Sequence, residues 1–351
     1  MLVGQPGVLK QVNEDIIKDY IYEKGPISKP ELAAATKLSL PTVNKIVDCL
    51  EEKNLVRQEG MIGSSSGRKA KTYVANESAG NIIALYFWDN TYIATLINMI
   101  GQRFHTVSVE VNTGSAKEAL ESTYKIIDEL SKKSTAPIKA IGIGVPGVVK
   151  KDNTISSIPS IKGWEGLNLK EVIEKKYNLP VYVENDVKLT TIGYYHDFLE
   201  KKYDNIVYLY VGKGIGSGII LNRILYRGFT SFAGEFGYLA APSAKEANYA
   251  KDGGWLETKI NEDPEDLENL LTIGIADYIA MLNPEAIVIQ SRKLKEESLE
   301  NIRKKLEHYI PEDNIPKLIS TPRNDCGLDG IFKMCMAGIF TSRKLVDKKK
   351  V

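Results

Sequence analysis

The pattern of apolar residues changes near residue 77, and this change constrains the fold more than any other feature of the sequence. Before it, apolar residues recur at the three- and four-residue spacings of amphipathic helices. After it, β-prone runs such as IIALYF and NIVYLYV alternate with helix-like stretches such as SAKEALESTYKIIDELSKK. Strands that alternate with helices are typical of α/β domains. A polar stretch at residues 74–81 separates the two patterns, so we expect a small domain at residues 1–77 and an α/β body at residues 78–351.

The composition narrows the class of protein. Of the 351 residues, 43% are hydrophobic and 26% are charged, which is typical of a soluble globular protein. The net charge of +1 predicts no polyanionic partner for the chain as a whole, so any DNA contact needs a local patch. The three cysteines lack CxxC spacing and predict neither a disulfide framework nor a cysteine zinc cluster. The start of the chain lacks the pattern of a signal peptide, and no apolar run approaches eighteen residues, so we expect a cytoplasmic protein.

The first 75 residues predict three helices. The apolar stripe of the first helix, which Gly25 ends, consists of Val12, Ile16, Ile17, Tyr20 and Ile21. Ser28 and Glu31 have the spacing of a capping box that opens a short second helix. Ser39 is the expected cap of a third helix. Its expected buried residues are Val43, Ile46, Val47 and Leu50, and its expected outward residues are Pro41, Thr42, Asn44 and Lys45.

These helices favour a DNA-binding head. Two helices joined by a short turn, the second polar at its N-terminal end, are typical of a helix-turn-helix whose second helix enters a major groove. The alternative is a three-helix packing module. The next segment favours the first interpretation, because two β-prone runs flank a Gly/Ser-rich tip with Arg68, Lys69 and Lys71, as in a wing. The predicted DNA contacts are Ser39, Thr42, Asn44, Lys45, Arg68 and Lys69.

The charge of the head limits its affinity for DNA. Residues 1–75 hold eleven lysines and arginines against nine acidic residues. Non-specific DNA binding should therefore be modest and salt-sensitive, and a dimer would double the contacts.

Three stretches of the body carry groups suited to a small-molecule site. VENDVKL places Glu184, Asn185 and Asp186 directly after a β-prone run, where α/β proteins collect ligands; the alternative is an Asx cap that opens the next helix, and both can hold at once. VGKGIGSG, residues 211–218, is either a phosphate-binding turn or an ordinary tight β-turn. Glu235 and Glu257, in AGEFGY and GGWLE, suit sugar hydroxyls, and the alternative is two solvated loop carboxylates.

Taken in this order, the motifs resemble the ROK family, named for repressors, open reading frames and kinases, over nearly the whole chain. The stretches that carry the resemblance are GPISKPELAAATKLSLPTVNKIVDCLEEKNLV with SSSGRK, IGIGVPGVV, SIKGWEGLNL, LPVYVENDV, VGKGIGSGIILNRILYRG and AGEFGY. The resemblance implies a winged helix-turn-helix followed by an actin-like, two-lobed sugar kinase fold. The implied lobes are residues 78–185 with a C-terminal helix at residues 325–351, and residues 186–324. It also implies sugar contacts from Asn185, Asp186, Glu235 and Glu257, with Asp186 at the place of the kinase base.

The chain departs from the family where many members hold a structural zinc. Those members have a histidine after the AGE segment and a cysteine-rich loop that ends in Gly-Cys-x-Glu. Here Tyr238 and Trp255 occupy two of these positions, and residues 197–307 contain no cysteine or histidine. Zinc requires thiolate or imidazole ligands at fixed spacing, so we expect no metal. Trp255 is expected to pack the loop, with a hydroxyl hydrogen bond from Tyr238.

The expected nucleotide site is also eroded. Family kinases carry Asp-x-Gly-Gly-Thr after the first strand of the body, whereas residues 86–91 are YFWDNT and lack glycine. Gln290 and Ser291 replace a Gly-Gly pair that borders adenine, and Lys213 stands where kinases usually have threonine. Because phosphoryl transfer depends on positioning and charge around the triphosphate, we expect no kinase activity and no cofactor.

The sequence therefore predicts a DNA-binding transcriptional regulator, a repressor of carbohydrate genes that binds double-stranded operator DNA as a homodimer or homotetramer and has no membrane partner. A sugar or sugar phosphate between the lobes is the expected effector. The residues expected to bind it are Asn185, Asp186, Glu235, Tyr238 and Glu257. Two alternatives stay open: an ATP-dependent sugar kinase of the ROK family, and a regulator that has lost sugar binding.

Overall fold

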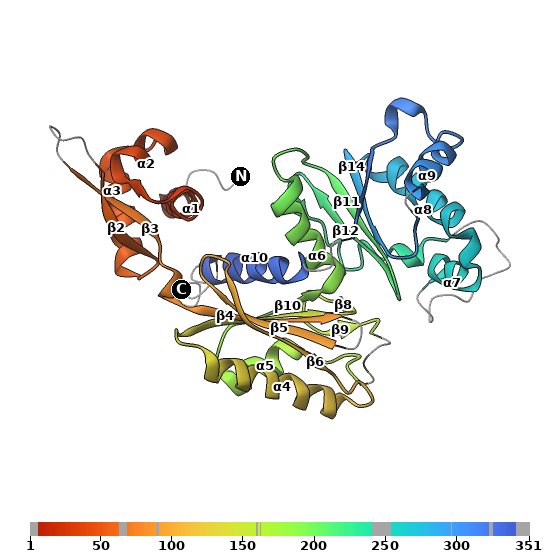
Figure 1. Cartoon of the computed structure of the whole chain (residues 1–351), viewed down its shortest axis with the longest axis horizontal. Coiled ribbons are helices and arrows are strands. Elements are labelled where there is room, and N and C mark those ends of the chain that lie inside the picture. Colours follow the sequence, from red (N-terminus) through yellow and green to blue (C-terminus); the bar gives the residue numbers. More distant parts are fainter. Residues whose placement is uncertain are drawn as a thin grey trace. The chain divides into compact units, whose positions relative to one another are not determined.

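The computed structural model describes residues 6–62, 69–88, 91–158, 161, 163–240, 254–295, 297–322 and 326–341 (Figure 1). The described residues fall into two compact units. One comprises the residues up to Ile82 together with Leu96–Phe104 and Lys133–Lys139, and the other comprises the rest of the described chain. None of the helices in these described ranges is long and apolar enough to cross a membrane.

The N-terminal part of the chain forms three helices and a small antiparallel sheet. Its elements are α1 (Pro6–Lys24), β1 (Ile27–Ser28), α2 (Lys29–Thr36), α3 (Leu40–Glu52), β2 (Val56–Ile62) and β3 (Ala70–Ala75). The strand order is β1-β3-β2, and β2 pairs with β3 as the two strands of a hairpin. The predicted order of three helices followed by a hairpin is confirmed.

Local capping sets the start of α2 and α3. The backbone N–H of Ser28 donates to the Glu31 carboxylate at 2.8 Å, and the Ser28 hydroxyl accepts from the Glu31 N–H at 3.4 Å, so the predicted capping box is present. Ser39 has extended backbone and caps α3 as expected. The four apolar residues expected on the inner face of α3 are all buried.

The apolar stripe predicted for α1 is partly wrong. Ile17 and Ile21 are buried, but Val12 and Ile16 are 45% and 43% exposed. Helix α1 contacts α3 and β3. At about 100° per residue, Ile16 lies about 100° and Val12 about 140° around the helix from Ile17, so both point away from the contact face. The buried face of α1 is therefore narrower than the spacing predicted.

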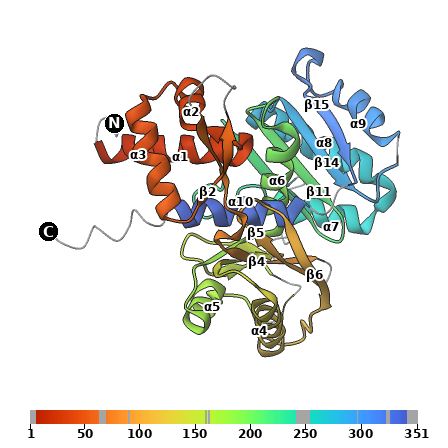
Figure 2. The ribbon, with the colours of Figure 1, turned by 60° about the vertical axis from the view of Figure 1, so that its left-hand side comes forward.

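The first five-stranded sheet of the body has the order β10-β7-β4-β5-β6. Its strands are β4 (Asn81–Trp88), β5 (Thr91–Asn98), β6 (Arg103–Glu110), β7 (Ile138–Val145) and β10 (Val181–Asn185). Helices α4 (Ala116–Lys133) and α5 (Leu169–Tyr177) lie on one side of this sheet, and α10 (Cys326–Thr341) lies on the other (Figures 1 and 2). A short hairpin of β8 (Val148–Val149) and β9 (Ile155–Ser156) follows β7.

The second five-stranded sheet has the order β13-β12-β11-β14-β15. Its strands are β11 (Ile206–Val211), β12 (Ile215–Leu221), β13 (Ile224–Leu225), β14 (Ala286–Ser291) and β15 (Lys317–Thr321). The nearby helices are α7 (Trp255–Glu262), α8 (Leu267–Leu282) and α9 (Ser298–Leu306). One apolar cluster joins side chains of β11, β12 and β14 to α7, α8 and α9, and it forms the core on that side of the sheet. The remaining short turns are η1 (Glu77–Ala79), the π-helical η2 (Tyr195–Leu199), η3 (Phe236–Tyr238), η5 (Pro264–Asp266) and η6 (Glu312–Asn314).

Helix α6 (Asp186–Tyr194) begins where β10 ends and contacts both β12 and α10. The crossing with α10 is close, because a Cβ on Gly193 would lie 2.0 Å from the Cys326 carbonyl oxygen and one on Gly330 would lie 1.9 Å from the Leu189 carbonyl oxygen. Only glycine fits at such a backbone contact. Helix α6, which begins at the junction with β10, is therefore packed directly against α10. The α/β prediction for the body is confirmed. The domain and lobe boundaries stay predictions.

Candidate functional site

The start of α3 presents polar groups at the surface of the head. The Ser39 hydroxyl accepts from the Thr42 N–H at 3.4 Å and shares a 2.8 Å hydrogen bond with the Thr42 hydroxyl. Ser39 and Lys45 are exposed, and Thr42 and Asn44 are half-buried. Lys69 is exposed beside β3, and Arg68 lies outside the described residues. The described members of the predicted DNA-contacting set thus have solvent-accessible side chains.

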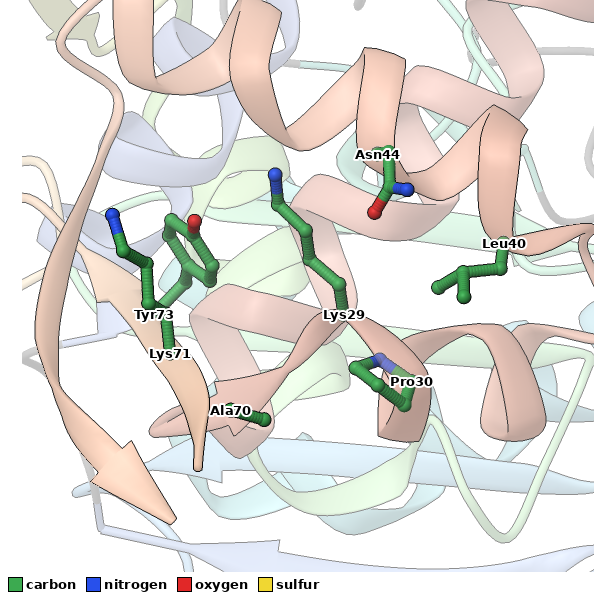
Figure 3. Close-up of a pocket in the computed structure, with 7 residues that line it drawn as sticks. All are labelled: Lys29, Pro30, Leu40, Asn44, Ala70, Lys71 and Tyr73. Atoms are coloured by element: carbon green, nitrogen blue, oxygen red, sulfur yellow. The ribbon is translucent and has the colours of Figure 1, made fainter. Parts of the chain in front are cut away.

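A hollow of about 250 Å³ lies beside these residues. Its lining residues are Lys29, Pro30, Leu40, Asn44, Ala70, Lys71 and Tyr73 (Figure 3). The Lys29 ammonium pairs with the Asp48 carboxylate and lies 5.3 Å from the centre of the Tyr73 ring. Burial is the largest single effect and acts to lower the pKa of Lys29, but the hydrogen bonds and charges of Asp48 and Tyr73 together outweigh it and the pKa is raised. Sequence reasoning missed Lys29, because its place at the start of α2 carries no sign that the wing strand folds beside it.

The second group of predicted site residues gathers at the junction of β10 and α6. The Asn185 side chain caps α6 by accepting from the Lys188 N–H at 2.9 Å, and it donates to the Gly147 carbonyl at 3.2 Å and to Asp186 at 3.1 Å. Asp186 also accepts from the Val187 N–H at 2.8 Å. The cap alternative for Asn185 is therefore confirmed, and it leaves the Asp186 carboxyl half-buried at the start of the helix.

The structure brings Glu235 within electrostatic reach of two other predicted carboxylates, Asp186 and Glu257. Burial raises the pKa of Asp186 to about 7, and Glu235 adds to this rise while the Val187 N–H opposes it. Burial likewise raises the pKa of Glu235, with Lys188 acting against the rise and Glu257 adding to it. Burial also raises the pKa of Glu257, although the carboxylate accepts from the Ile215 N–H at 3.0 Å. A cluster of half-buried acids with raised pKa values is typical of a functional site.

Tyr238 and Trp255 pack against aromatic and apolar side chains. The Tyr238 ring packs edge-on against Phe232, with 5.0 Å between ring centres. Trp255 is partly buried and packs against the apolar core of the second sheet. Among the residues that the structure describes, no group of three or more His, Cys, Asp or Glu side chains has the geometry of a metal site.

The glycine turn at residues 211–218 is the connection of a β-hairpin. β11 pairs with β12 in antiparallel register up to Val211 and Ile215. Tyr210, at the end of β11, packs against Trp88 of β4 with 5.1 Å between ring centres. Because the Ile215 N–H donates to Glu257, one donor of this turn is engaged within the protein.

Two further pairs at the junction were missed. Arg227 Nε donates to Glu184 Oε2 at 2.7 Å, and Lys188 Nζ donates to the Ser231 carbonyl at 2.5 Å. Each pair joins residues 43 positions apart. No local spacing rule predicts such contacts.

Two protein-family models match the chain, one in the N-terminal head and one in the α/β body. The family model described as winged helix-turn-helix DNA-binding matches residues 15–57, and the ROK family model matches residues 90–261. The chain has a ROK family domain behind a winged helix-turn-helix. The resemblance inferred from the motifs is thereby confirmed.

The chain is similar in sequence to proteins named xylose repressor and shares its fold with a solved ROK regulator and a ROK glucokinase. The chain is 28% identical over 303 residues to the xylose repressor of Caldicellulosiruptor bescii, covering 83% of this chain and 76% of that protein. A solved ROK family transcriptional regulator, described as a homolog of the E. coli MLC protein, aligns with a TM-score of 0.79 at 19% identity over 95% of this chain and 97% of that one. The ROK glucokinase of Streptomyces griseus, solved with glucose and AMPPNP, aligns with a TM-score of 0.60 at 20% identity over 74% of this chain and 100% of that one. At these identities the structural likeness shows the shared fold alone.

Proposed function

We propose that the protein is a DNA-binding transcriptional repressor of carbohydrate genes whose DNA affinity is set by a sugar effector. The observation that carries this proposal is the joining, in one chain, of a winged helix-turn-helix and a ROK domain with clustered half-buried carboxylates. The similarity to proteins named xylose repressor supports it. The protein is proposed to act as a homodimer or homotetramer, because paired heads double the contacts of a weakly basic head.

The proposed DNA-binding face is the N-terminal part of α3 with the wing. Thr42, Asn44 and Lys45 are proposed to meet base edges or phosphates in the major groove, with Ser39 at the start of the helix. Arg68 and Lys69 are proposed to contact the backbone or minor groove from the wing. Lys71, which lines the hollow together with Asn44 of α3, adds a positive charge beside this face.

The proposed effector site comprises Asn185, Asp186, Glu235, Tyr238 and Glu257. Carboxylate and amide oxygens accept hydrogen bonds from sugar hydroxyls, and their partial burial strengthens such bonds by excluding water. Effector control requires that the sugar binds one arrangement of the body better than another. A regulator that has lost sugar binding is the alternative in which this cluster has no ligand.

We further propose that the protein has no kinase activity. The Ile215 N–H of the glycine turn is held by Glu257, and Trp88 packs on Tyr210 at the end of the strand before that turn. The fold shared with a ROK glucokinase, together with Asp186, favours the sugar kinase as second candidate. Phosphorylation of xylose, glucose or N-acetylglucosamine by ATP at an ordinary enzymatic rate would establish that candidate.

Two sets of variants test the proposed function. Replacing Asn44 and Lys45 by Ala should weaken binding to DNA from upstream of the gene by about tenfold or more, since each base contact contributes about 1–3 kcal/mol. Lys117→Ala, on an exposed face of α4, is the matched control. Unchanged DNA affinity in the double variant would contradict the assigned face.

The second set concerns the effector. Replacing Asp186 and Glu235 by Ala should abolish the response to sugar and leave DNA binding without sugar unchanged. Asp152→Ala, an exposed carboxylate held by Thr154, is the control. A full response to sugar in the double variant would place the effector elsewhere.

A further inference from the structure

Two charged contacts tie the segment before Glu235 to the junction of β10 and α6. Arg227 Nε donates to Glu184 Oε2 at 2.7 Å, and Lys188 Nζ donates to the Ser231 carbonyl at 2.5 Å. Both contacts span 43 residues, so residues 184–188 and 227–231 lie side by side in matching register.

The tie of Lys188 to Ser231 is buried at both ends, and the tie of Arg227 to Glu184 is buried at Glu184, whereas the Arg227 side chain is 43% exposed. The exposed fractions of Glu184, Lys188 and Ser231 are 5%, 1% and 2%. Lysine and glutamate are rarely buried unless each has a partner, because an unpaired charge in the interior is costly. The buried Lys188 and Glu184 groups therefore hold a specific geometry, unlike ion pairs in which both groups are exposed and which contribute little.

The backbone of the tied segment supports the same conclusion. Ser231 has a φ of 67°, in the left-handed region that non-glycine residues seldom adopt. Its carbonyl accepts from Lys188 in this conformation. Strained residues persist where the surroundings hold them, and they concentrate at functional sites.

The tied segment ends at Glu235. Three residues after Ser231, the chain is held again at Gly234, whose carbonyl accepts from the Ser217 N–H at 2.7 Å and from the Ser217 hydroxyl at 2.8 Å. Glu235 directly follows this second fixed point. The position of its carboxylate relative to Asp186 is thus set by Lys188 on one side and by Ser217 on the other.

We propose that Lys188 and Arg227 are positioning residues of the effector site, which hold the 227–235 segment so that Glu235 meets the ligand together with Asp186. This inference rests on the proposed effector function of the carboxylate cluster. Lys188 also supplies a positive charge that favours the ionised form of Glu235, and Arg227 holds the Glu184 carboxylate beside Lys188.

The charged surroundings of Glu235 define what the loss of Lys188 should do. The titratable groups that face Glu235 are Lys188 and Asp186 from α6, Glu257 from α7 and Tyr278 from α8. Lys188 is the cation of this set, and it lowers the pKa of Glu235 against the effect of burial. Without Lys188, the Glu235 carboxyl should ionise, and accept sugar hydroxyls, only at higher pH.

The test is calorimetric titration of the folded full chain with xylose, glucose and N-acetylglucosamine between pH 5.5 and pH 9. Lys188→Met should weaken binding of the responding sugar by about tenfold at pH 7 and move the pH midpoint of binding upward by about one unit. Lys188→Arg should restore most of the affinity. Arg227→Met should weaken sugar binding without moving the pH midpoint. Because the Arg227 side chain is partly exposed, this variant replaces Lys188→Met as the test if Lys188→Met fails to fold.

Arg223→Met is the matched control. Arg223 lies four residues before Arg227 and pairs with Asp204 at 2.6 Å, on the exposed turn after β12, so its loss should leave sugar binding unchanged. Wild-type affinity and pH midpoint in folded Lys188→Met, or in Arg227→Met, would overturn the positioning role. If none of the three sugars binds the wild type, the effector proposal itself fails and the positioning role falls with it. If the wild type binds sugar and Arg223→Met loses this binding, the specific role of the two ties is equally contradicted.

Discussion

Asp186 should make the protein less stable at neutral pH than it would be with an uncharged side chain. Its folded-state pKa is about 7, raised mainly by burial from the ordinary value of 3.8. Between these two pH values the folded protein holds a proton that the unfolded chain has released. Stability therefore falls as the pH rises from about 4 to about 7 and is constant above that range. Asp186→Asn should remove this loss.

The expected magnitude follows from the size of the shift. A rise of about three pH units corresponds to about 4 kcal/mol at about 1.4 kcal/mol per unit. Because the carboxyl group is half-buried and partly solvated, we expect about 2 kcal/mol. The amide oxygen of Asn can still accept from the Val187 N–H, so the start of α6 should be preserved. Glu235 and Tyr86 also face Asp186 and are unchanged by the substitution.

The assay is urea unfolding of wild type and Asp186→Asn from pH 4 to pH 8.5. The variant should be about 2 kcal/mol more stable at pH 8, and the difference should disappear near pH 4. Asp152→Asn is the control, and its effect on stability should have the opposite sign. Hydrogen bonds from Thr154 lower the pKa of Asp152 and favour its charged form. A variant that is no more stable than the wild type at pH 8, or a difference that does not change with pH, would refute this reasoning.

Three further substitutions test the head and the body. Ser39→Ala should destabilise the head by about 1 kcal/mol, because Thr42 loses its cap; an unchanged thermal midpoint would contradict the capping role. Lys45→Ala should reduce the slope of DNA affinity against salt concentration, on logarithmic axes, by about 1, and an unchanged slope would mean that Lys45 meets no phosphate. Gly330→Ala should cost about 3 kcal/mol in circular-dichroism melts, since its Cβ would lie 1.9 Å from the Leu189 carbonyl oxygen; a fully stable variant would show that α10 can shift on α6.

Local rules predicted the head well. The cap at Ser39 and the capping box of Ser28 and Glu31 depend on residues three positions apart, and the structure contains both. The extent of the buried face of α1 could not be predicted in this way, because it depends on which side of Ile17 and Ile21 the rest of the head packs. The spacing rule therefore assigned Val12 and Ile16 to the core, and both are exposed.

The candidate effector site shows the same limit more clearly. The position of Asn185 and Asp186 at the end of a strand was predictable, because strand ends and helix caps have local signatures. The ties of Glu184 to Arg227 and of Lys188 to Ser231 link segments 43 residues apart, and only the folded chain brings them together. Lys188 follows Asp186 by two positions and is buried. The sequence could not predict this burial, because a charged residue near the start of a helix is normally expected to face solvent.

The most direct test of the proposed repressor is fluorescence anisotropy of the wild-type protein on DNA from upstream of its own gene, at fixed salt, with and without xylose, glucose, N-acetylglucosamine and their phosphates. We predict tight, sequence-selective binding whose affinity one of these ligands changes by about tenfold or more. Binding that is equal for upstream and scrambled DNA, at both low and physiological salt, would contradict the assignment of the head as a reader of operator DNA.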